Sequence, residues 1–249
     1  MMVLITLASI IFITSMHGQE THQDAYIEKL YVEAAKTSGA EFNNIDRISK
    51  WLRFYGEIDH LHPYYKEATT TLGLLFYDEQ IYEESAIYLD LYSKTFQKLN
   101  RDNIPLMTKL ADAWSKSGQY IKASEITRAI IENYKSTGNW TGFINQNHIL
   151  SSIYITHHQY RKALACNMEI LEIMLQKRID IHDLATVYNN IGYNQTQLNE
   201  FNNAINSYQK ALHLIDKSNL PDLHCTILIN LANAYHNTND PEAEIKLLE

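Results

Sequence analysis

Hydrophobic and small residues along this chain follow a helical spacing that short polar segments interrupt at regular distances. The clearest example lies between Asp183 and Ser218, where apolar or small side chains recur every three to four residues in two blocks. A polar break at Gln197 to Glu200 separates the blocks. The spacing predicts a pair of antiparallel helices, in which Gly192 and Ala204 let the two backbones approach closely.

The same arrangement returns along the rest of the chain. The small residues that correspond to one another are Gly73, Ala111, Ser151, Gly192 and Ala232, at steps of 38, 40, 41 and 40 residues. Only eight glycines and four prolines occur among 249 residues. So few helix-breaking residues, combined with the long periodicity, predict an all-α chain with short turns.

The repeated unit resembles the tetratricopeptide repeat, in which bulky, small and aromatic residues recur at set spacings. The matching residues are Tyr188, Ile191-Gly192, Phe201, Ala204, Tyr208 and Ala211, whereas Gln195 replaces a usual aromatic and Asp216 a usual proline. The resemblance implies a right-handed superhelical solenoid of antiparallel helix pairs. Because the period is about 40 residues and the usual one is about 34, we expect each second helix, or its following turn, to be longer.

Three segments are expected along the chain. Residues 1–18 are predicted to be a signal peptide, residues 19–63 a degenerate N-terminal repeat or cap, and residues 64–249 a solenoid of about five repeats. The apolar run from Val3 to Ile13 suits an export signal and is short for a membrane span, although an uncleaved anchor or a mis-assigned start would also explain it. The last repeat is incomplete, so we expect further chain or a partner to cover its end.

The sequence does not point to an enzyme. It contains no phosphate-binding glycine loop, no HExxH, no paired CxxC motifs and no glycine-flanked serine nucleophile, so no cofactor and no catalytic residue are expected. His157 and His158 are adjacent, and neighbouring side chains on a helix point about 100° apart, so a solvated turn is favoured over a metal site.

Charge and cysteine content narrow the classes of partner further. The net charge is −8 without a basic run, which argues against nucleic-acid binding. Cys166 and Cys225 fall in different repeats, and we expect both to be buried as small apolar residues without forming a disulfide.

The resemblance implies a concave groove, lined by the first helix of each pair, that binds a peptide or protein partner. Neutral polar side chains on the face opposite the packed small residues could donate to and accept from an extended peptide backbone. Substitution of one of them, Asn189→Ala, is expected to weaken the binding of a partner and to leave folding nearly intact. The candidate groove residues are Thr108, Asp112, Asn145, His148, Ser152, Thr186, Asn189, Tyr193, Asn233 and His236.

These observations predict an exported protein-interaction or sensor module in the periplasm or cell envelope. The chain is similar to the extracytoplasmic input segments of bacterial signalling proteins, which precede a membrane helix and a histidine kinase or transcription-regulator module. The alternative is a free periplasmic or secreted scaffold for assembly of an envelope complex. Membrane attachment is expected only through the N-terminal signal or a C-terminal anchor beyond this sequence.

Overall fold

The computed structural model describes residues 23–38, 42–178, 181–215 and 220–238. The expected signal peptide, residues 1–18, and the end of the expected last repeat, residues 239–249, therefore lie outside the described residues. The chain divides into two compact units, residues 1–98 and residues 99–249. Each unit is described by itself.

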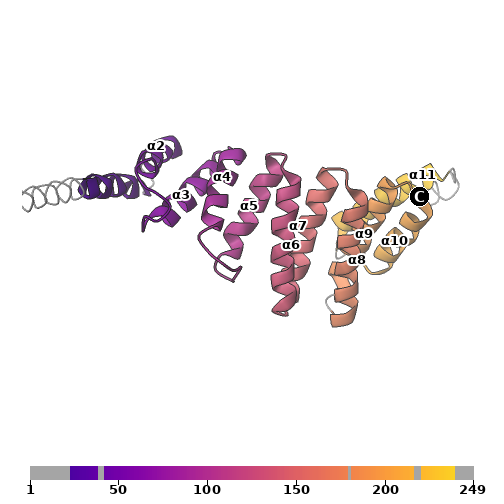
Figure 1. The fold of residues 1–249 in the computed structure, drawn as a ribbon. Helices are drawn as coiled ribbons and strands as arrows, with labels where there is room; N and C mark the ends of the chain where they lie inside the picture. Colours follow the sequence, from indigo (N-terminus) through magenta and orange to yellow (C-terminus); the bar gives the residue numbers. More distant parts are fainter. Residues whose placement is uncertain (1–22, 39–41, 179–180, 216–219, 239–249) are drawn as a thin grey trace, which may run out of the picture. The chain divides into compact units, whose positions relative to one another are not determined.

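The first unit consists of helices joined by short connections (Figure 1). Residues 23–35 form a helix that continues into η1 (Lys36–Ser38). They are followed by α2 (Asn44–Tyr55), α3 (Tyr65–Asp78) and α4 (Tyr82–Ser93). Consecutive helices pack against each other, α2 on α3 and α3 on α4.

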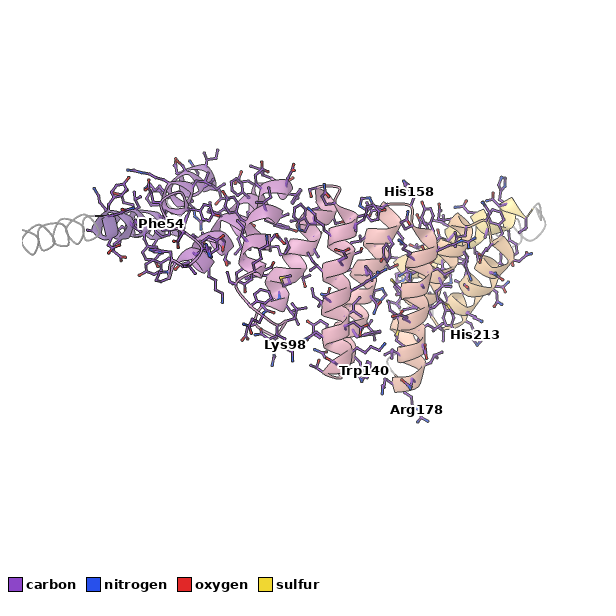
Figure 2. The ribbon with its side chains drawn as sticks, viewed as in Figure 1. Phe54, Lys98, Trp140, His158, Arg178 and His213 are labelled. Carbon is purple, nitrogen blue, oxygen red and sulfur yellow. The ribbon has the colours of Figure 1, made fainter. Side chains whose placement is uncertain are left out.

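An aromatic cluster forms the centre of the first unit. Phe54 of α2, which is labelled in Figure 2, lies at its middle. The side chain is fully buried, and its ring centroid lies 5.5 Å from that of Tyr31 and 5.9 Å from that of Trp51. Tyr31 also stacks on Tyr64 at 3.9 Å with nearly parallel rings. The helix over residues 23–35, α2 and the segment before α3 therefore share one core.

The second unit contains seven helices among its described residues. Each packs against the next in chain order, and α9 also contacts α11. Within the part of the chain that the structure describes, no strand occurs, and no helix combines the length and apolar character that crossing a bilayer requires. The helices are α5 (Ile104–Lys116), α6 (Tyr120–Ser136), α7 (Trp140–Thr156), α8 (Tyr160–Lys177), α9 (Ile181–Gln197), α10 (Phe201–His213) and α11 (Pro221–Asn237) (Figure 1).

The all-α prediction is confirmed for the described residues, and the packing of consecutive helices is typical of a tetratricopeptide-like solenoid. The long period has two structural origins. Two of the second helices are long, α6 with 17 residues and α8 with 18. The other two, α4 with 12 and α10 with 13, are shorter and are followed by longer connections.

The small residues of the repeat lie where first and second helices approach most closely. A Cβ atom added to Gly73 would lie 2.6 Å from Cγ of Leu89, and one added to Gly192 would lie 2.6 Å from Cε1 of Tyr208. At the corresponding place in α7, Asn167 Nδ2 donates a hydrogen bond to Ser151 Oγ at 2.9 Å. Each partner follows its small residue by 16 positions, so these contacts repeat with the sequence period.

The turns of the four fully described helix pairs, α3–α4, α5–α6, α7–α8 and α9–α10, each contain one residue in the left-handed backbone conformation. These residues are Gln80, Gly118, His158 and Asn199, with φ between 57° and 84°, and each follows its small residue by seven positions. The next amide in the chain donates back to the end of the first helix, as in Glu200 N to Gln195 O at 2.8 Å. This is the Schellman type of helix ending, which favours glycine.

The non-glycine turns carry a backbone strain that glycine would relieve. We expect Gln80→Gly to raise the free energy of unfolding by about 0.5 to 1 kcal/mol, because glycine has no Cβ to disfavour a positive φ. Gly118→Ala is the reciprocal change. A Cβ there would meet nothing within 4 Å, so backbone strain accounts for the expected loss of about 1 to 2 kcal/mol.

Urea unfolding of both variants, followed by circular dichroism, measures these changes. Equal stability of Gly118→Ala and the wild type would contradict the assigned turn conformation.

Candidate binding surfaces

The ten predicted groove residues all lie on first helices of the second unit. We call them the first-helix face: Thr108 and Asp112 on α5, Asn145, His148 and Ser152 on α7, Thr186, Asn189 and Tyr193 on α9, and Asn233 and His236 on α11. Within each helix, neighbouring members of this set are three or four residues apart, and the first and last members of each set of three are seven residues apart. This spacing places them on one side of the helix.

Most of the first-helix face is accessible. Asn145, Ser152, Asn233 and His236 are exposed, and Thr108, Asp112, His148, Thr186 and Tyr193 are half-buried. Asn189 differs, because only 8% of its surface is exposed. Nine of the ten residues could therefore be reached by a partner without rearrangement of the helices.

Two hydrogen bonds connect neighbouring first helices at this face. Gln146 Nε2 on α7 donates to Thr108 Oγ1 on α5 at 3.2 Å. Asn230 Nδ2 on α11 donates to Asn189 Oδ1 on α9 at 3.0 Å. Asn189 therefore helps to hold α9 against α11, and Asn189→Ala would disturb folding as well as any partner contact.

The charge on this face is partly neutralised within one helix. Lys116 Nζ lies 2.8 Å from Asp112 Oδ2, four residues earlier on α5. Both side chains are near 40% exposed, so the pair contributes little to stability. The rest of the first-helix face is polar and carries no lysine or arginine among its ten residues.

The adjacent histidines of the α7–α8 turn contact different tyrosines. The His157 ring stacks on Tyr120 with centroids 4.5 Å apart, whereas His158 Nδ1 lies 2.9 Å from the Tyr160 hydroxyl. His158 and Arg178 mark opposite ends of α8 (Figure 2). The two imidazoles therefore belong to separate contacts, and among the described residues no group of three or more metal-binding side chains assembles.

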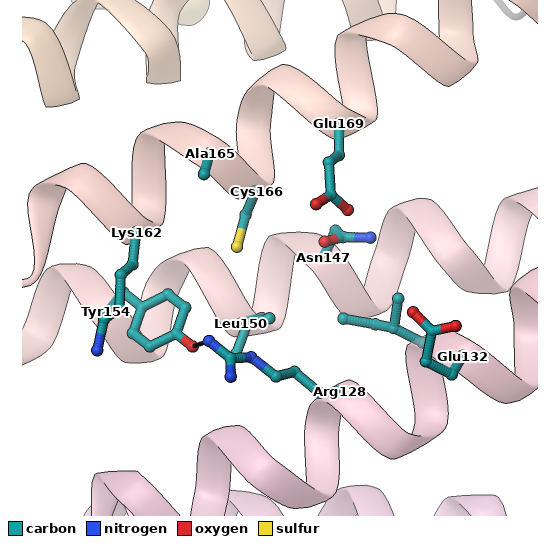
Figure 3. Close-up of a pocket in the computed structure, with 10 residues that line it drawn as sticks. Arg128, Glu132, Asn147, Leu150, Tyr154, Lys162, Ala165, Cys166 and Glu169 are labelled. Carbon is teal, nitrogen blue, oxygen red and sulfur yellow. Dashed lines mark hydrogen bonds between the residues drawn. The ribbon is translucent and has the colours of Figure 1, made fainter.

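A cleft of about 370 Å³ lies on another side of the second unit, between α6, α7 and α8 (Figure 3). None of the ten predicted residues lines it. Arg128 Nη2 donates to the Tyr154 hydroxyl at 2.5 Å across this cleft. The sequence analysis missed it, because its residues come from three helices and the apolar ones belong to the ordinary core pattern. It is lined by Arg128, Ile131, Glu132, Asn147, Leu150, Tyr154, Lys162, Ala165, Cys166 and Glu169.

The two cysteines differ in exposure. Cys166 borders the cleft and is 6% exposed, whereas Cys225 on α11 is exposed, so the prediction that both are buried is wrong for Cys225. Burial raises the pKa of the Cys166 thiol to about 12, with a smaller contribution from Glu169. The thiolate is the reactive form, so Cys166 is protected by both burial and protonation.

Alkylation should therefore distinguish the two thiols. We expect iodoacetamide at pH 8 to add one group to the native protein, at Cys225, and two groups after unfolding in guanidinium. Intact-mass measurement and peptide mapping identify the modified site. Rapid modification of Cys166 in the native protein would contradict the packing of α8.

Comparisons with known proteins agree with the geometry of the helix pairs. Residues 185–217, which include most of α9 and all of α10, match the model of the tetratricopeptide repeat family. The chain is 31% identical over 109 residues to the uncharacterized protein ycf37 of Cyanophora paradoxa, a match that covers 44% of this chain. It spans 59% of the length of that relative.

Solved structures with similar folds are also helical-repeat proteins. The apo form of RapI superposes with a TM-score of 0.62 at 14% identity, covering 91% of this chain and 72% of RapI. BtubC (BKLC) from P. vanneervenii superposes with a TM-score of 0.56 at 17% identity, covering 89% of this chain and 87% of BtubC. A putative kinesin light chain from Podosopora anserina, with nearly identical TPR-like repeats, superposes with a TM-score of 0.58 at 14% identity. This match covers 76% of this chain and 93% of the kinesin light chain structure.

The chain therefore has a tetratricopeptide-like helical-repeat fold, and a tetratricopeptide repeat occupies residues 185–217. Such a fold implies a scaffold for protein interactions, because its stacked helices present extended surfaces. The identity of a partner does not follow from the fold.

Proposed function

We propose that this chain is a non-enzymatic interaction module that holds an extended peptide, or an extended segment of a partner protein, on its first-helix face. The supporting observation is a set of accessible neutral polar side chains carried by successive first helices. Asn145, Ser152 and Asn233 are exposed. An asparagine amide both donates and accepts, which suits the alternating N–H and C=O groups of a peptide backbone.

The links between first helices support the same proposal. The bonds from Gln146 to Thr108 and from Asn230 to Asn189 join α5 to α7 and α9 to α11. A surface whose helices are already fixed loses less conformational entropy when it binds. The first-helix face is thus organised before a partner arrives.

Selection of peptides followed by substitution of matched asparagines tests this proposal. Peptides would be selected from a random displayed library on the full chain and their affinities measured by fluorescence anisotropy. Asn145→Ala, on the exposed side of α7, is expected to weaken the selected peptides about tenfold, the loss of a hydrogen bond or two. Asn202→Ala changes an asparagine on the second helix α10 that is also exposed, and it serves as the control.

Combining Asn145→Ala with Ser152→Ala should weaken binding further without changing the melting temperature. If the selected peptides bind the double variant as tightly as the wild type, the first-helix face is not their site. Equal losses with Asn202→Ala would also contradict the assignment.

An extracytoplasmic location is part of the proposal and is supported by the sequence. The apolar run from Val3 to Ile13 has the length of a signal core. Expression of the full chain in a bacterium, followed by fractionation and mass spectrometry, should recover a periplasmic product whose N-terminus is near Gln19. Recovery of an intact chain in the cytoplasmic fraction would contradict export.

Within that location, we favour the input part of a signalling protein over a free scaffold. The first role requires an output domain, a histidine kinase or transcription regulator, connected through a membrane helix of about 20 apolar residues. The second requires only a capping helix. The coding sequence downstream of Glu249 distinguishes the two.

A further inference from the structure

The cleft between α6, α7 and α8 has opposite charges at its two ends. Figure 3 shows Lys162 and the paired Arg128 and Tyr154 at one end, with Glu132 and Glu169 toward the other. All four charged side chains are exposed, whereas the Tyr154 ring is buried. The cleft is therefore open to solvent and has a buried floor.

Both cations at the first end are arranged around one aromatic ring. The Arg128 guanidinium carbon lies 5.8 Å from the Tyr154 ring centroid, and Lys162 Nζ lies 5.5 Å from it. The hydrogen bond to the Tyr154 hydroxyl uses one guanidinium N–H of Arg128 and fixes its position. Other N–H groups of the same guanidinium can still bind a carboxylate, for which their planar fork is suited.

At the second end, two carboxylates face the same space from different helices. Glu132 is on α6 and Glu169 is on α8. Among the described residues, no ion pair within 4.0 Å joins either carboxylate to Arg128 or Lys162, so the two ends are not neutralised by each other. Two carboxylates that converge on one open site favour a cationic group between them.

The helix geometry gives the rise along the axis between the residues that carry the charges. Arg128 and Glu132 are four residues apart on α6, which corresponds to about 6 Å along the axis. Lys162 and Glu169 are seven residues apart on α8, or about 10 Å. A ligand that contacts both ends should therefore carry its negative and positive groups about 6 to 10 Å apart.

From this arrangement we infer that the cleft binds short zwitterionic peptides of two to three residues, with the C-terminal carboxylate at Arg128 and Lys162 and the N-terminal ammonium at Glu132 and Glu169. An extended chain rises about 3.3 to 3.6 Å per residue, so two to three residues span the required distance. The cleft volume of about 370 Å³ lies at the lower end of the range for small-ligand sites.

The floor of the cleft favours an aliphatic central side chain. Ile131, Leu150 and Cys166 are buried beneath it and present apolar surface. Asn147, which is 1% exposed, is held by a hydrogen bond to Phe143 O at 3.2 Å. This site lies outside the first-helix face, so its failure and that of the proposed partner surface are independent.

Capped and uncapped forms of one tripeptide test the inference directly. The full chain would be titrated by isothermal calorimetry with Ala-Leu-Ala, with its N-acetylated form and with its C-amidated form. We expect the free peptide to bind and each single cap to weaken binding at least tenfold, because each removes one charge. Saturating free peptide should also raise the melting temperature, since it binds only the folded chain.

Charge-removing substitutions assign the two ends of the peptide. Lys162→Gln should weaken the free and the acetylated peptides but leave the amidated one unchanged, and Glu169→Gln should show the converse pattern. Arg161→Gln and Glu172→Gln change exposed residues of α8 that do not line the cleft, and they should bind like the wild type.

The inference would be overturned by absence of binding at 10 mM free peptide, by equal affinity of the free and capped forms, or by equal losses in the cleft and control variants. Binding of longer peptides with both ends capped would point instead to a side-chain recognition site and would also contradict it. Circular dichroism of each variant verifies that the fold is retained.

Discussion

Replacing Gly192 with leucine is expected to lower the free energy of unfolding by about 3 kcal/mol, through overpacking of the α9–α10 pair. A Cβ atom at this position would lie 2.6, 2.8 and 2.9 Å from three carbons of the Tyr208 ring. Tyr208 is 1% exposed, and its hydroxyl lies 3.2 Å from Thr196 Oγ1. The ring therefore cannot move aside without separating the two helices or losing this contact.

Urea unfolding at 25 °C measures the change, and a second substitution distinguishes its cause. Tyr208→Ala alone should be destabilising because it creates a cavity. In the double variant, the leucine side chain can occupy part of the space that the ring leaves. The loss of unfolding free energy in the double variant should therefore be smaller than the sum of the losses in the two single variants. Strict additivity, or an unchanged unfolding midpoint for Gly192→Leu, would contradict the contact between α9 and α10.

Phe54→Ala should be the most damaging truncation in the first unit, with an expected loss of about 3 to 5 kcal/mol. Phe54 is fully buried, and four aromatic rings surround it with centroids 5.5 to 6.4 Å away. Those rings come from three parts of the chain: the helix over residues 23–35, α2 itself and the segment before α3. They cannot collapse together into the space without moving the backbone. The cavity should therefore remain largely open.

Hydrogen exchange followed by mass spectrometry locates this effect along the chain. Peptides from α2 and α3 should lose most of their protection, whereas peptides from α8 and α9 serve as an internal reference, because repeat arrays are stabilised mainly by neighbouring units. Leu61→Ala, which removes a side chain that is 79% exposed, is the matched control and should leave exchange unchanged. A uniform loss of protection across the whole chain would contradict a local core around Phe54.

Several features of the fold could be predicted because they depend on nearby residues. The close contacts at Gly73, Ser151 and Gly192 involve partners 16 positions later, within the same helix pair. The turn at Gly118 carries the residue type that a positive φ favours, but Gln80 and His158 adopt the same conformation without a glycine. In those turns the packing of the two helices imposes a positive φ that the residue itself does not favour.

Burial on the last described helix could not be read reliably from residue type. Cys225 was predicted to be buried and is exposed. Three residues of α11, Ile227, Leu231 and Ala234, face the core that is shared with α10, whereas the fourth buried residue, Ala232, does not belong to that cluster. Cys225 precedes Ile227 by two positions, or about 200° around the helix, and so lies on the opposite side.

The sequence by itself determined the helix pairs, their period of about 40 residues and the accessibility of most residues of the first-helix face, because helical periodicity and close packing within a pair are local properties. The tertiary structure decided that Asn189 bonds to Asn230, 41 residues away. It also decided that Arg128, Tyr154 and Glu169 meet in one cleft. Such contacts join different repeats, and their geometry depends on how successive helix pairs pack, which the spacing within one pair does not specify.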